Sequence, residues 1–342
     1  MTFTGPKQLI PVANKPISQY VLEDSVEAGI CDVAIVLGNI YPEKVKEYYG
    51  DGSKFGSKIT YIHQGEPKGI AHAVKLCEDF VGKDKFIVYL GDNLIKGGIA
   101  NFAKRFGENK ELDAMILLTQ VKDPGRFGVA KFDSSGRIVE LIEKPKEPPS
   151  KFALAGLYFL SALIFKMISD LKPSWRGELE ITEAIQMLLN RGANVTHDII
   201  QGWWKDTGKA EDIIEANRLV LDELESDLSG TIEDDLSIQG RVSIGKGSVV
   251  KKGALIRGPV VVGDSTIIES SVYLGPYTSV GGNCIIRRGE IENSIIMDGC
   301  EVDVDDRIVD SLIGASSRVA SYVSNMPRGR SFILGESSSV LL

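Results

Sequence analysis

The sequence predicts an α/β domain with a mixed, mostly parallel sheet over residues 1–220, followed by a left-handed parallel β-helix over residues 221–342. Strand and helix patterns alternate through about the first 210 residues, which is typical of α/β domains. In the last third, aliphatic residues recur at nearly every sixth position, which indicates a triangular coil with flat faces of about six residues each. These positions are Ile232, Ile238, Ile244, Val250, Ile256, Val262, Ile268, Leu274, Val280 and Ile286.

The first half of the α/β region opens with a predicted helix between Pro16 and Gly29, because proline favours a helix start and glycine a helix end. Further elements are expected at residues 32–37 (strand), 41–49 (helix), 59–62 (strand), 69–80 (helix) and 86–90 (strand). The strands are largely aliphatic, which predicts a sheet covered on both faces.

After residue 120 the pattern changes. Residues 129–132 and 137–142 flank an Asp-Ser-Ser-Gly turn and predict a β-hairpin. The remaining elements expected are a strand at 154–160, an amphipathic helix at 178–189 and a charged helix at 209–224. Residues 331–334 and 339–342 have a strand-like pattern, and we expect them to cover the end of the β-helix, since an uncovered coil leaves an open edge.

Composition excludes several classes of protein. The net charge of −8 argues against a general nucleic-acid binder, which needs a basic surface. No apolar run approaches about 18 residues and no signal peptide opens the chain, so a cytoplasmic protein without a membrane partner is expected. The four cysteines are scattered without a CxxC pair, which indicates reduced thiols rather than a zinc site.

Charged residues at loops suggest phosphate and metal chemistry. Asp92 directly follows the strand expected at 86–90, where open α/β sheets bind ligands, and a carboxylate there is a natural Mg²⁺ ligand. Asp206 lies in a second loop, after two tryptophans. Taken alone, each aspartate also fits a turn cap, and the lysines Lys7 and Lys144 also fit solvated charges. Together, the four suit a magnesium-bound nucleoside triphosphate that reacts with a sugar phosphate.

Eight segments then show a resemblance that covers nearly the whole chain. They are GPKQLIPVANKP (5–16), QGEPKGIAHA (64–73), YLGDN (89–93), DPGRFGVAKFD (123–133), EKPKEPPS (143–150), ALAGLYF (153–159), PSWRGELEIT (173–182) and GWWKDTGK (202–209). In order and spacing they resemble the sugar-1-phosphate nucleotidylyltransferases, and in particular the long form of the glucose-1-phosphate thymidylyltransferases, which carries a left-handed β-helix. The resemblance implies an enzyme that uses Mg²⁺ to join dTTP and α-D-glucose 1-phosphate, giving dTDP-glucose and pyrophosphate.

The resemblance also implies roles for residues at matching positions. Asp92 and Asp206 would bind Mg²⁺, Lys7 would contact the triphosphate or pyrophosphate, and Gln64 and Gly69 would read the base edge. The sugar-phosphate side would be formed by Gly128, Glu143, Lys144, Gly156 and Trp204, with Lys144 near the phosphate. Phe127 stands where some relatives have tyrosine, so one hydroxyl that they offer to the sugar is missing here.

One departure from the family pattern leaves alternatives open. Relatives have a strand and a GxGTRLxP loop before the segment that begins at Pro6, and this sequence has neither. In the family this piece supplies a central strand, a backbone cradle for the triphosphate and an arginine. The alternatives are therefore a sequence that starts late or a non-catalytic, regulatory subunit that binds nucleotide sugars. A relative that uses UTP in place of dTTP is a separate alternative.

The β-helix region has two candidate roles. Many such solenoids transfer acyl groups with a histidine base, but His63, His72 and His197 all precede the repeat. Acyl transfer is therefore disfavoured. We expect the β-helix to support the first domain or to mediate assembly of a homo-oligomer.

Overall fold

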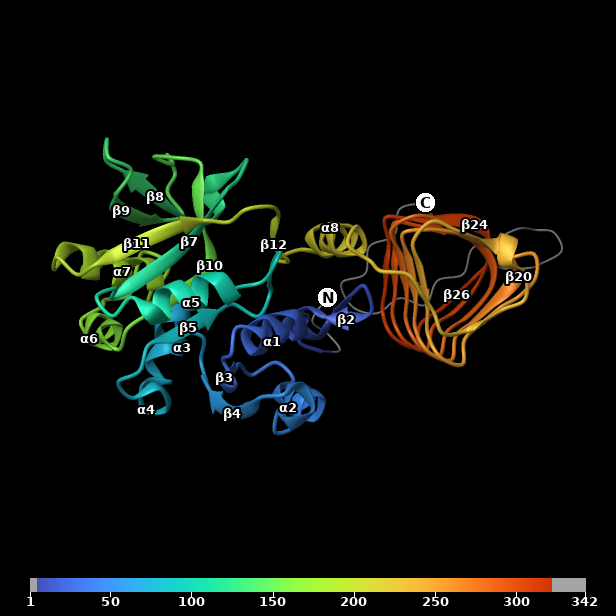
Figure 1. The fold of residues 1–342 in the computed structure, drawn as a ribbon, viewed down its shortest axis with the longest axis horizontal. Coiled ribbons are helices and arrows are strands. Elements are labelled where there is room, and N and C mark those ends of the chain that lie inside the picture. Colours follow the sequence, from blue (N-terminus) through green and yellow to red (C-terminus); the bar gives the residue numbers. More distant parts are fainter. Residues whose placement is uncertain (1–4, 322–342) are drawn as a thin grey trace. The chain divides into compact units, whose positions relative to one another are not determined.

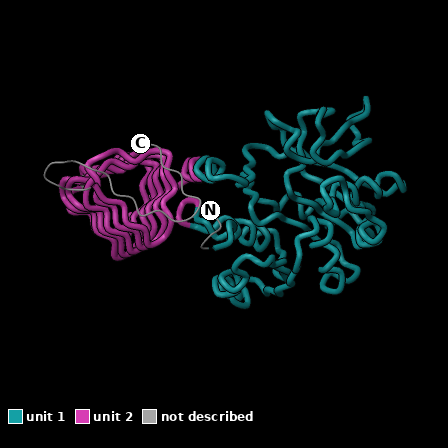
Figure 2. Tube along the Cα trace, turned by 180° about the vertical axis from the view of Figure 1, so that it is seen from behind, with its two compact units in different colours: residues 1–11, 15–216 teal, residues 12–14, 217–342 magenta. Residues whose placement is uncertain are grey.

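The computed structural model describes residues 5–321. The chain divides into two compact units, which are described separately (Figure 2). Unit 1 comprises Met1–Pro11 and Lys15–Ala216, and unit 2 comprises Val12–Asn14 and Asn217–Leu342. The strand-like segments at 331–334 and 339–342, expected to cover the end of the β-helix, lie outside the described residues. Within the described residues, no helix is long and apolar enough to cross a membrane.

Unit 1 contains a mixed six-stranded sheet in the order β11-β7-β10-β8-β9, with β5 also paired to β10. The strands are β5 (Phe86–Tyr89), β7 (Ala114–Gln120), β8 (Gly128–Phe132), β9 (Ile138–Glu143), β10 (Phe152–Leu160) and β11 (Val195–Ile199). Four of them (β5, β7, β8 and β11) run in one direction, as a mostly parallel sheet requires. However, the reversed β10 lies among them, so most neighbouring pairs are antiparallel.

Both faces of this sheet are covered. All residues of β7 except Gln120 are buried, and they alternate between two apolar clusters. Ala114, Ile116 and Leu118 pack in one cluster, which includes residues of α6 and α7, and Met115 and Leu117 pack in the other. Successive strand side chains point to opposite faces, so a strand buried on both sides shows a continuous aliphatic run. The expectation of a sheet covered on both faces is confirmed.

Three small sheets complete the strands of unit 1. These are the parallel pair β3 (Asp32–Leu37) and β4 (Lys58–His63), the hairpin β1 (Pro11–Val12) and β2 (Lys15–Pro16), and the antiparallel pair β6 (Asn93–Ile95) and β12 (Trp204–Asp206). Residue Val12 of that hairpin already belongs to unit 2. Among the described strands, β3 pairs only with β4, and β5 only with β10.

The expected helices are present, one of them divided, and two further helices, α5 and α6, were not predicted (Figure 1). They are α1 (Ile17–Glu27), α2 (Pro42–Tyr49), α3 (Ile70–Lys75), α4 (Glu78–Val81), α5 (Ala100–Glu108), α6 (Leu163–Ser169), α7 (Ile181–Asn190) and α8 (Ala210–Leu221). The single helix predicted at 69–80 is divided into α3 and α4, because the backbone leaves the helical conformation at Cys77 (φ −90°, ψ 3°). Short 3₁₀ turns lie at Lys7–Leu9, Ser53–Phe55, Pro124–Arg126 and Asp235–Ser237.

Unit 2 is a parallel β-helix of about five coils, which stack on one another (Figure 1). One face has the strand order β13-β16-β19-β21-β23-β25 and another β14-β17-β20-β22-β24-β26, and β15 pairs with β18. The strands are Asp227–Leu228, Thr231–Ile232, Ile238–Gln239, Val242–Ile244, Val249–Val250, Leu255–Arg257, Val260–Val262, Ile267–Leu274, Thr278–Val280, Ile285–Glu292, Ile295–Ile296, Glu301–Val309, Leu312–Ile313 and Arg318–Ala320, from β13 to β26.

The register of these strands explains the period of six. Val250 pairs with Ile268, and Ile268 with Ile286, so one coil takes 18 residues over three faces. All three side chains are fully buried and stack along the inside of the coil. Burial of one such side chain contributes about 1.5–3 kcal/mol to the free energy of unfolding.

Candidate active site

Asp92 and Asp206 lie side by side, at the ends of a short antiparallel ladder. Asp206 on β12 is directly opposite Asn93 on β6, and residues so paired have Cα atoms only about 4.5–5.5 Å apart. Thr207 strengthens this junction, since its backbone N–H and its hydroxyl donate to the Asp92 carbonyl at 3.0 and 2.8 Å. The structure thus brings together two carboxylates that are more than 100 residues apart in the sequence.

The charges around these carboxylates are partly balanced. Lys7 Nζ lies 2.6 Å from Asp92 Oδ2, and Asn93 Nδ2 donates to Asp92 Oδ1 at 2.8 Å. Burial raises the pKa of Asp206, the charge of Asp92 raises it further, and the charge of Lys7 lowers it. Two half-buried carboxylates that repel each other form a site where a cation is stabilising.

The donor set fits Mg²⁺. This ion is usually bound by one or two carboxylates together with substrate phosphates and water. Among the described residues, no cluster of three or more histidine, cysteine or acidic side chains offers a complete protein cage. The buried Oδ1 of Asn93, which accepts no hydrogen bond from the described residues, is a further oxygen beside Asp92.

The hairpin of β8 and β9 positions a second group of polar residues. Glu143 pairs with Gly128, and Thr182 donates a 2.6 Å hydrogen bond to Glu143 Oε2. A Cβ atom on Gly128 would lie 2.9 Å from Thr182 Oγ1 and 3.1 Å from Glu143 Oε2, so only glycine leaves this space open. Burial raises the pKa of Glu143, and the hydrogen bond from Thr182 partly offsets this by lowering it.

Lys144 has an unusual backbone conformation next to this glutamate. Its φ of 41° is in the left-handed region, and its N–H donates to the Phe127 carbonyl at 3.0 Å. Non-glycine residues with positive φ are uncommon and are concentrated at functional sites. The tight turn therefore fixes the direction in which the Lys144 side chain leaves the hairpin.

Gly156 lies where β10 changes partners. Before it, Ala153 pairs with Val129 on β8, and after it, Leu157 pairs with Tyr89 on β5. The φ of Gly156 is 70°, and a Cβ atom there would lie 3.1 Å from the Asn93 side chain. Gly156 thus lets β10 change from one neighbouring strand to another directly beside Asn93, the residue that follows Asp92.

Trp204 packs beside Phe127. Its indole N–H donates to the Ala155 carbonyl at 2.9 Å, and the two rings meet edge to face with centroids 5.4 Å apart. Both residues thus lie next to the positions of Gly128 and Gly156, where the sugar-phosphate side was predicted.

Gln64 and Gly69 form a separate part of the site. Gly69 has a φ of 96°, and a Cβ atom on it would lie 2.5 Å from the Leu179 carbonyl oxygen, so no other residue fits. Gln64 Nε2 donates to the Gly69 carbonyl at 3.2 Å. Within the described residues, no hydrogen bond or ion pair joins Gln64 or Gly69 to Asp92 or Asp206.

The structure also shows polar residues whose roles sequence reasoning missed. Arg176 Nη1 lies 3.9 Å from Glu143 Oε1 and 3.3 Å from the buried Glu180 carboxylate. Thr182 and Asn93 make the contacts described above. All three lie in the quoted segments, and the sequence signal for Arg176 is an arginine in a glycine-containing loop between a proline and two glutamates.

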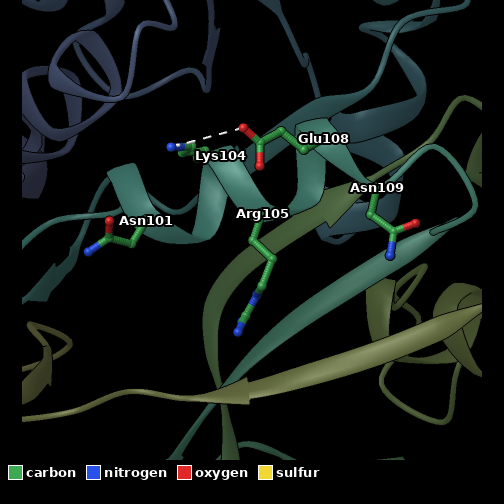
Figure 3. A pocket seen from close by; sticks show the side chains of 5 residues that line it. All are labelled: Asn101, Lys104, Arg105, Glu108 and Asn109. Atoms are coloured by element: carbon green, nitrogen blue, oxygen red, sulfur yellow. Dashed lines mark ion pairs between the residues drawn. The ribbon is translucent and has the colours of Figure 1, made fainter.

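A surface hollow lies away from these residues. It has a volume of about 380 Å³ and is lined by Asn101, Lys104, Arg105, Glu108 and Asn109 (Figure 3). The lining comes from α5 and the residue after it, and Lys104 and Glu108 pair along the helix at 4.0 Å. Ligand sites usually have convergent groups from several elements, so this hollow is a groove beside one helix.

Comparisons with known proteins identify one family. The family model "Nucleotidyl transferase" matches residues 1–223, and "GMPPB C-terminal domain" matches residues 256–340. The chain is 46% identical to the low-salt glycan biosynthesis nucleotidyltransferase Agl11 of Haloferax volcanii over 342 residues, which cover 100% of this chain and 96% of that protein. It is 44% identical to a glucose-1-phosphate thymidylyltransferase of Streptomyces antibioticus over 340 residues, covering 99% and 94% of the two chains.

Solved structures show the same relationship. A putative glucose-1-phosphate thymidylyltransferase of Bacillus anthracis, in complex with a sucrose, has a TM-score of 0.59 and 40% identity, covering 62% of this chain and 85% of that one. A UDP-glucose pyrophosphorylase in complex with UDP-glucose, at 24% identity and a TM-score of 0.56, shares the fold. The chain belongs to the nucleotidyl transferase family, is an enzyme of that family, and resembles the long form of glucose-1-phosphate thymidylyltransferase over its whole length.

Proposed function

We propose that the chain transfers a thymidylyl group from dTTP to α-D-glucose 1-phosphate, which yields dTDP-glucose and pyrophosphate. The observation that carries the proposal is the β6–β12 ladder, which places Asp206 beside Asp92, together with the Lys7 ammonium 2.6 Å from Asp92. Two carboxylates and a lysine at one point suit a triphosphate with its cation. The Streptomyces relatives named glucose-1-phosphate thymidylyltransferase support the choice of substrates.

In this proposal, Asp92 and Asp206 hold Mg²⁺, which supplies positive charge to the triphosphate. Lys7 is the protein's own cation at that place and contacts the triphosphate or the released pyrophosphate. Because Lys7 already lies 2.6 Å from Asp92, its ammonium is held at the site before substrate binds. A pre-positioned charge contributes more to catalysis than one that must be reoriented during the reaction.

The sugar phosphate would occupy the space kept open by Gly128 and Gly156. Glu143, fixed by the Thr182 hydroxyl, would accept hydrogen bonds from the sugar, and Lys144 would contact its phosphate. Trp204 would form one wall. Gln64 and Gly69 would bind the base, with the Gln64 amide exchanging its present bond to the Gly69 carbonyl for one to the base edge.

The chemistry asks for little covalent participation by the protein. An oxygen of the sugar phosphate attacks the α-phosphate of the nucleotide in line, and pyrophosphate leaves. The residues therefore act by orienting the two phosphates and by balancing their charge. Nucleoside triphosphates are cytoplasmic metabolites, so the proposal places the chain in the cytoplasm. The proposal also includes assembly of a homo-oligomer through the β-helix.

The test is a matrix of substrates with the purified chain and Mg²⁺. Release of pyrophosphate would be measured for dTTP and UTP, each with glucose 1-phosphate and with other sugar 1-phosphates. We expect the highest kcat/KM for dTTP with glucose 1-phosphate. A higher value for UTP would replace the base in the proposal. Binding of nucleotide sugars without turnover of any pair would instead indicate a regulatory subunit.

A further inference from the structure

Arg126 lies beside both groups of polar residues in the candidate active site. It ends a 3₁₀ turn and directly precedes Phe127, whose carbonyl accepts the Lys144 N–H at 3.0 Å. Its guanidinium carbon lies 5.5 Å from the centre of the Phe127 ring, within the range of a cation–π contact. The same ring meets Trp204 edge to face, two residues before Asp206. The Phe127 ring and carbonyl thus link the arginine to both the predicted sugar-phosphate side and the carboxylates.

The guanidinium of Arg126 is close to the carboxylates and only loosely paired. Its Nη2 lies 3.9 Å from Asp212 Oδ2, which is too far for a hydrogen bond, and its side chain is 43% exposed. A Cβ atom on Gly208 would lie 3.8 Å from Asp212 Oδ2 and 3.2 Å from Asp206 Oδ2, so both carboxylates border one small space. Burial raises the pKa of Asp206 most, and the charge of Arg126 is among those that lower it. Arg126 therefore adds positive charge where the Mg²⁺ ligands were predicted.

Asp212 does not need Arg126 to balance its charge. Lys205 Nζ lies 2.8 Å from Asp212 Oδ1, and the Lys209 N–H donates to Asp212 Oδ2 at 3.1 Å. Both bonds are shorter than the contact with Arg126, and the Lys205 ammonium is also held by Glu215. A long, exposed ion pair contributes little to the stability of a protein. Arg126 can therefore leave Asp212 for another anion without stranding a charge.

Phosphate is the anion that an arginine at this place suits. The planar guanidinium offers parallel N–H donors that bind phosphate oxygens two at a time, and such bonds are about twice as strong as neutral ones. In the proposed function, Lys7 and Mg²⁺ serve the triphosphate, whereas only Lys144 serves the phosphate of the sugar. A phosphate monoester carries about two negative charges at pH 7, so one lysine leaves it half balanced.

We propose that Arg126 is a second cation for the sugar phosphate, and that it exchanges its loose pair with Asp212 for hydrogen bonds to the phosphate of glucose 1-phosphate. This inference rests on the proposed function, because it names a further binding residue for one substrate of that reaction. The triphosphate is the other source of phosphate at this place. The position of Arg126 next to Phe127, which is bonded to Lys144, favours the sugar phosphate.

The test compares two substitutions of Arg126 with a matched control. Arg126→Gln removes the charge, and Arg126→Lys keeps the charge without the paired donors. The control is Arg137→Gln, which changes an exposed arginine that pairs with Asp133 at 3.1 Å at the opposite end of the β8–β9 hairpin. kcat and the KM values for glucose 1-phosphate and for dTTP would be measured for each variant, with the melting temperature as a check on folding.

We expect Arg126→Gln to raise KM for glucose 1-phosphate about tenfold or more, and Arg126→Lys about threefold, with KM for dTTP unchanged in both. Arg137→Gln should change neither KM, and all three variants should melt as the wild type does. Unchanged KM values in Arg126→Gln would overturn the proposal. A rise confined to dTTP would assign the arginine to the triphosphate, and a change confined to kcat would exclude a role in substrate binding; either result would overturn the proposal as well.

A second readout does not depend on turnover. Binding of glucose 1-phosphate would be measured by calorimetry in the presence of dTMP, which has no pyrophosphate to release. Arg126→Gln should weaken this binding about tenfold. Asp212→Asn removes the competing carboxylate, so it should tighten binding about twofold, but not when it is combined with Arg126→Gln. The same effect of Asp212→Asn in both backgrounds would exclude the exchange of partners.

The proposed function and the role of Arg126 fail in different ways. If the chain turns over dTTP and glucose 1-phosphate while Arg126→Gln behaves as Arg137→Gln does, only the role of Arg126 fails. If no substrate pair is turned over while glucose 1-phosphate binds with the expected dependence on Arg126, the proposed function fails and the role of Arg126 stands.

Discussion

The β-helix differs in its residues from the corner around the β6–β12 ladder, where Asp92, Asn93 and Asp206 lie. In the β-helix, buried aliphatic side chains stack on like ones in the next coil, as Val250 does on Ile268, 18 residues away. In the corner, a three-residue ladder joins segments more than 100 residues apart. It brings together the carboxylates of Asp92 and Asp206, the buried Asn93 amide, and Gly156, where β10 changes partners. The comparison teaches that regular repetition buries apolar side chains, while the irregular junction gathers the polar groups on which the proposed chemistry depends.

Asp206→Asn tests the β6–β12 corner directly, and we expect the largest effect from this substitution. Because this change removes one of two adjacent carboxylates and with it a proposed ligand for Mg²⁺, we expect kcat to fall about 100- to 1000-fold. The β-helix should melt as in the wild type. The control is Asp170→Asn, which removes an exposed carboxylate paired with Arg191. Wild-type turnover in Asp206→Asn, measured by pyrophosphate release, would remove Asp206 from the site.

Two glycine substitutions test the contrast in both regions. In Gly263→Ala, the new Cβ would lie 2.6 Å from the Gly282 nitrogen, so we expect a loss of about 1–3 kcal/mol in the free energy of unfolding with kcat/KM unchanged. In Gly156→Ala, the Cβ would push against Asn93, and kcat/KM should fall about tenfold or more. Denaturant unfolding and steady-state kinetics measure both. Equal losses of activity in Gly263→Ala and Gly156→Ala would contradict the proposed difference between the two regions.

A third test uses pH. Burial raises the pKa of Asp24 to about 6, and the Tyr89 hydroxyl, which donates to it at 3.0 Å, partly offsets this. A carboxyl with a raised pKa in the folded state stabilises at low pH, and that contribution is lost as the pH rises through about 6. Asp24→Asn keeps an acceptor for Tyr89, so it should be more stable than wild type by about 1–2 kcal/mol at pH 7.5 and equal to it near pH 4.

The β-helix provides a control in which the pKa of a carboxyl group is shifted in the opposite direction. Glu233 is exposed, and its hydrogen bond from Lys251 lowers the pKa of its carboxyl. Glu233→Gln should therefore lack the stabilisation above pH 6 that Asp24→Asn shows. Melting temperatures between pH 4 and 8 decide both, and a pH-independent difference for Asp24→Asn would refute the buried-carboxyl explanation.

The smallest effect comes from one substitution made in each region. Thr182→Val removes the hydroxyl that donates to Glu143, so KM for glucose 1-phosphate should rise about fivefold. Loss of this bond should also raise the pKa of Glu143 further, which shifts the pH profile of that KM upward. Thr266→Val, which breaks a bond of the same kind in the β-helix, should change neither. Identical profiles for both variants would place Thr182 outside the sugar side.

The contrast also explains how much could be predicted from the sequence. The β-helix was largely predictable, because its first coils place a buried aliphatic side chain at every sixth position. After Ile286 the spacing shortens, since Ile286 pairs with Val302 and Ile291 with Ile308. In unit 1, six strands were predicted (β3, β4, β5, β8, β9 and β10), whereas β7 and β11 of the main sheet were missed. The reversed place of β10 could not be predicted either, because pairing between distant strands depends on contacts that no local pattern encodes. Similarly, the aspartates could be chosen from their loops, whereas the contacts of Thr182 and Arg176 with Glu143 depend on the folded chain.

The turn at residues 12–14 has a consequence for how the chain folds. Its bonds to Asn217 and Val280 join residues 204 and 266 positions apart. On the ribosome, residues 12–14 emerge among the first, and their partners follow only when most of the chain has been made. Unit 1 can form most of its core before then, but the bond from Asn14 forms only once β21, the fourth strand of its face of the β-helix, exists. Closure of such long loops is slow, so the docking of the turn is a late step in folding.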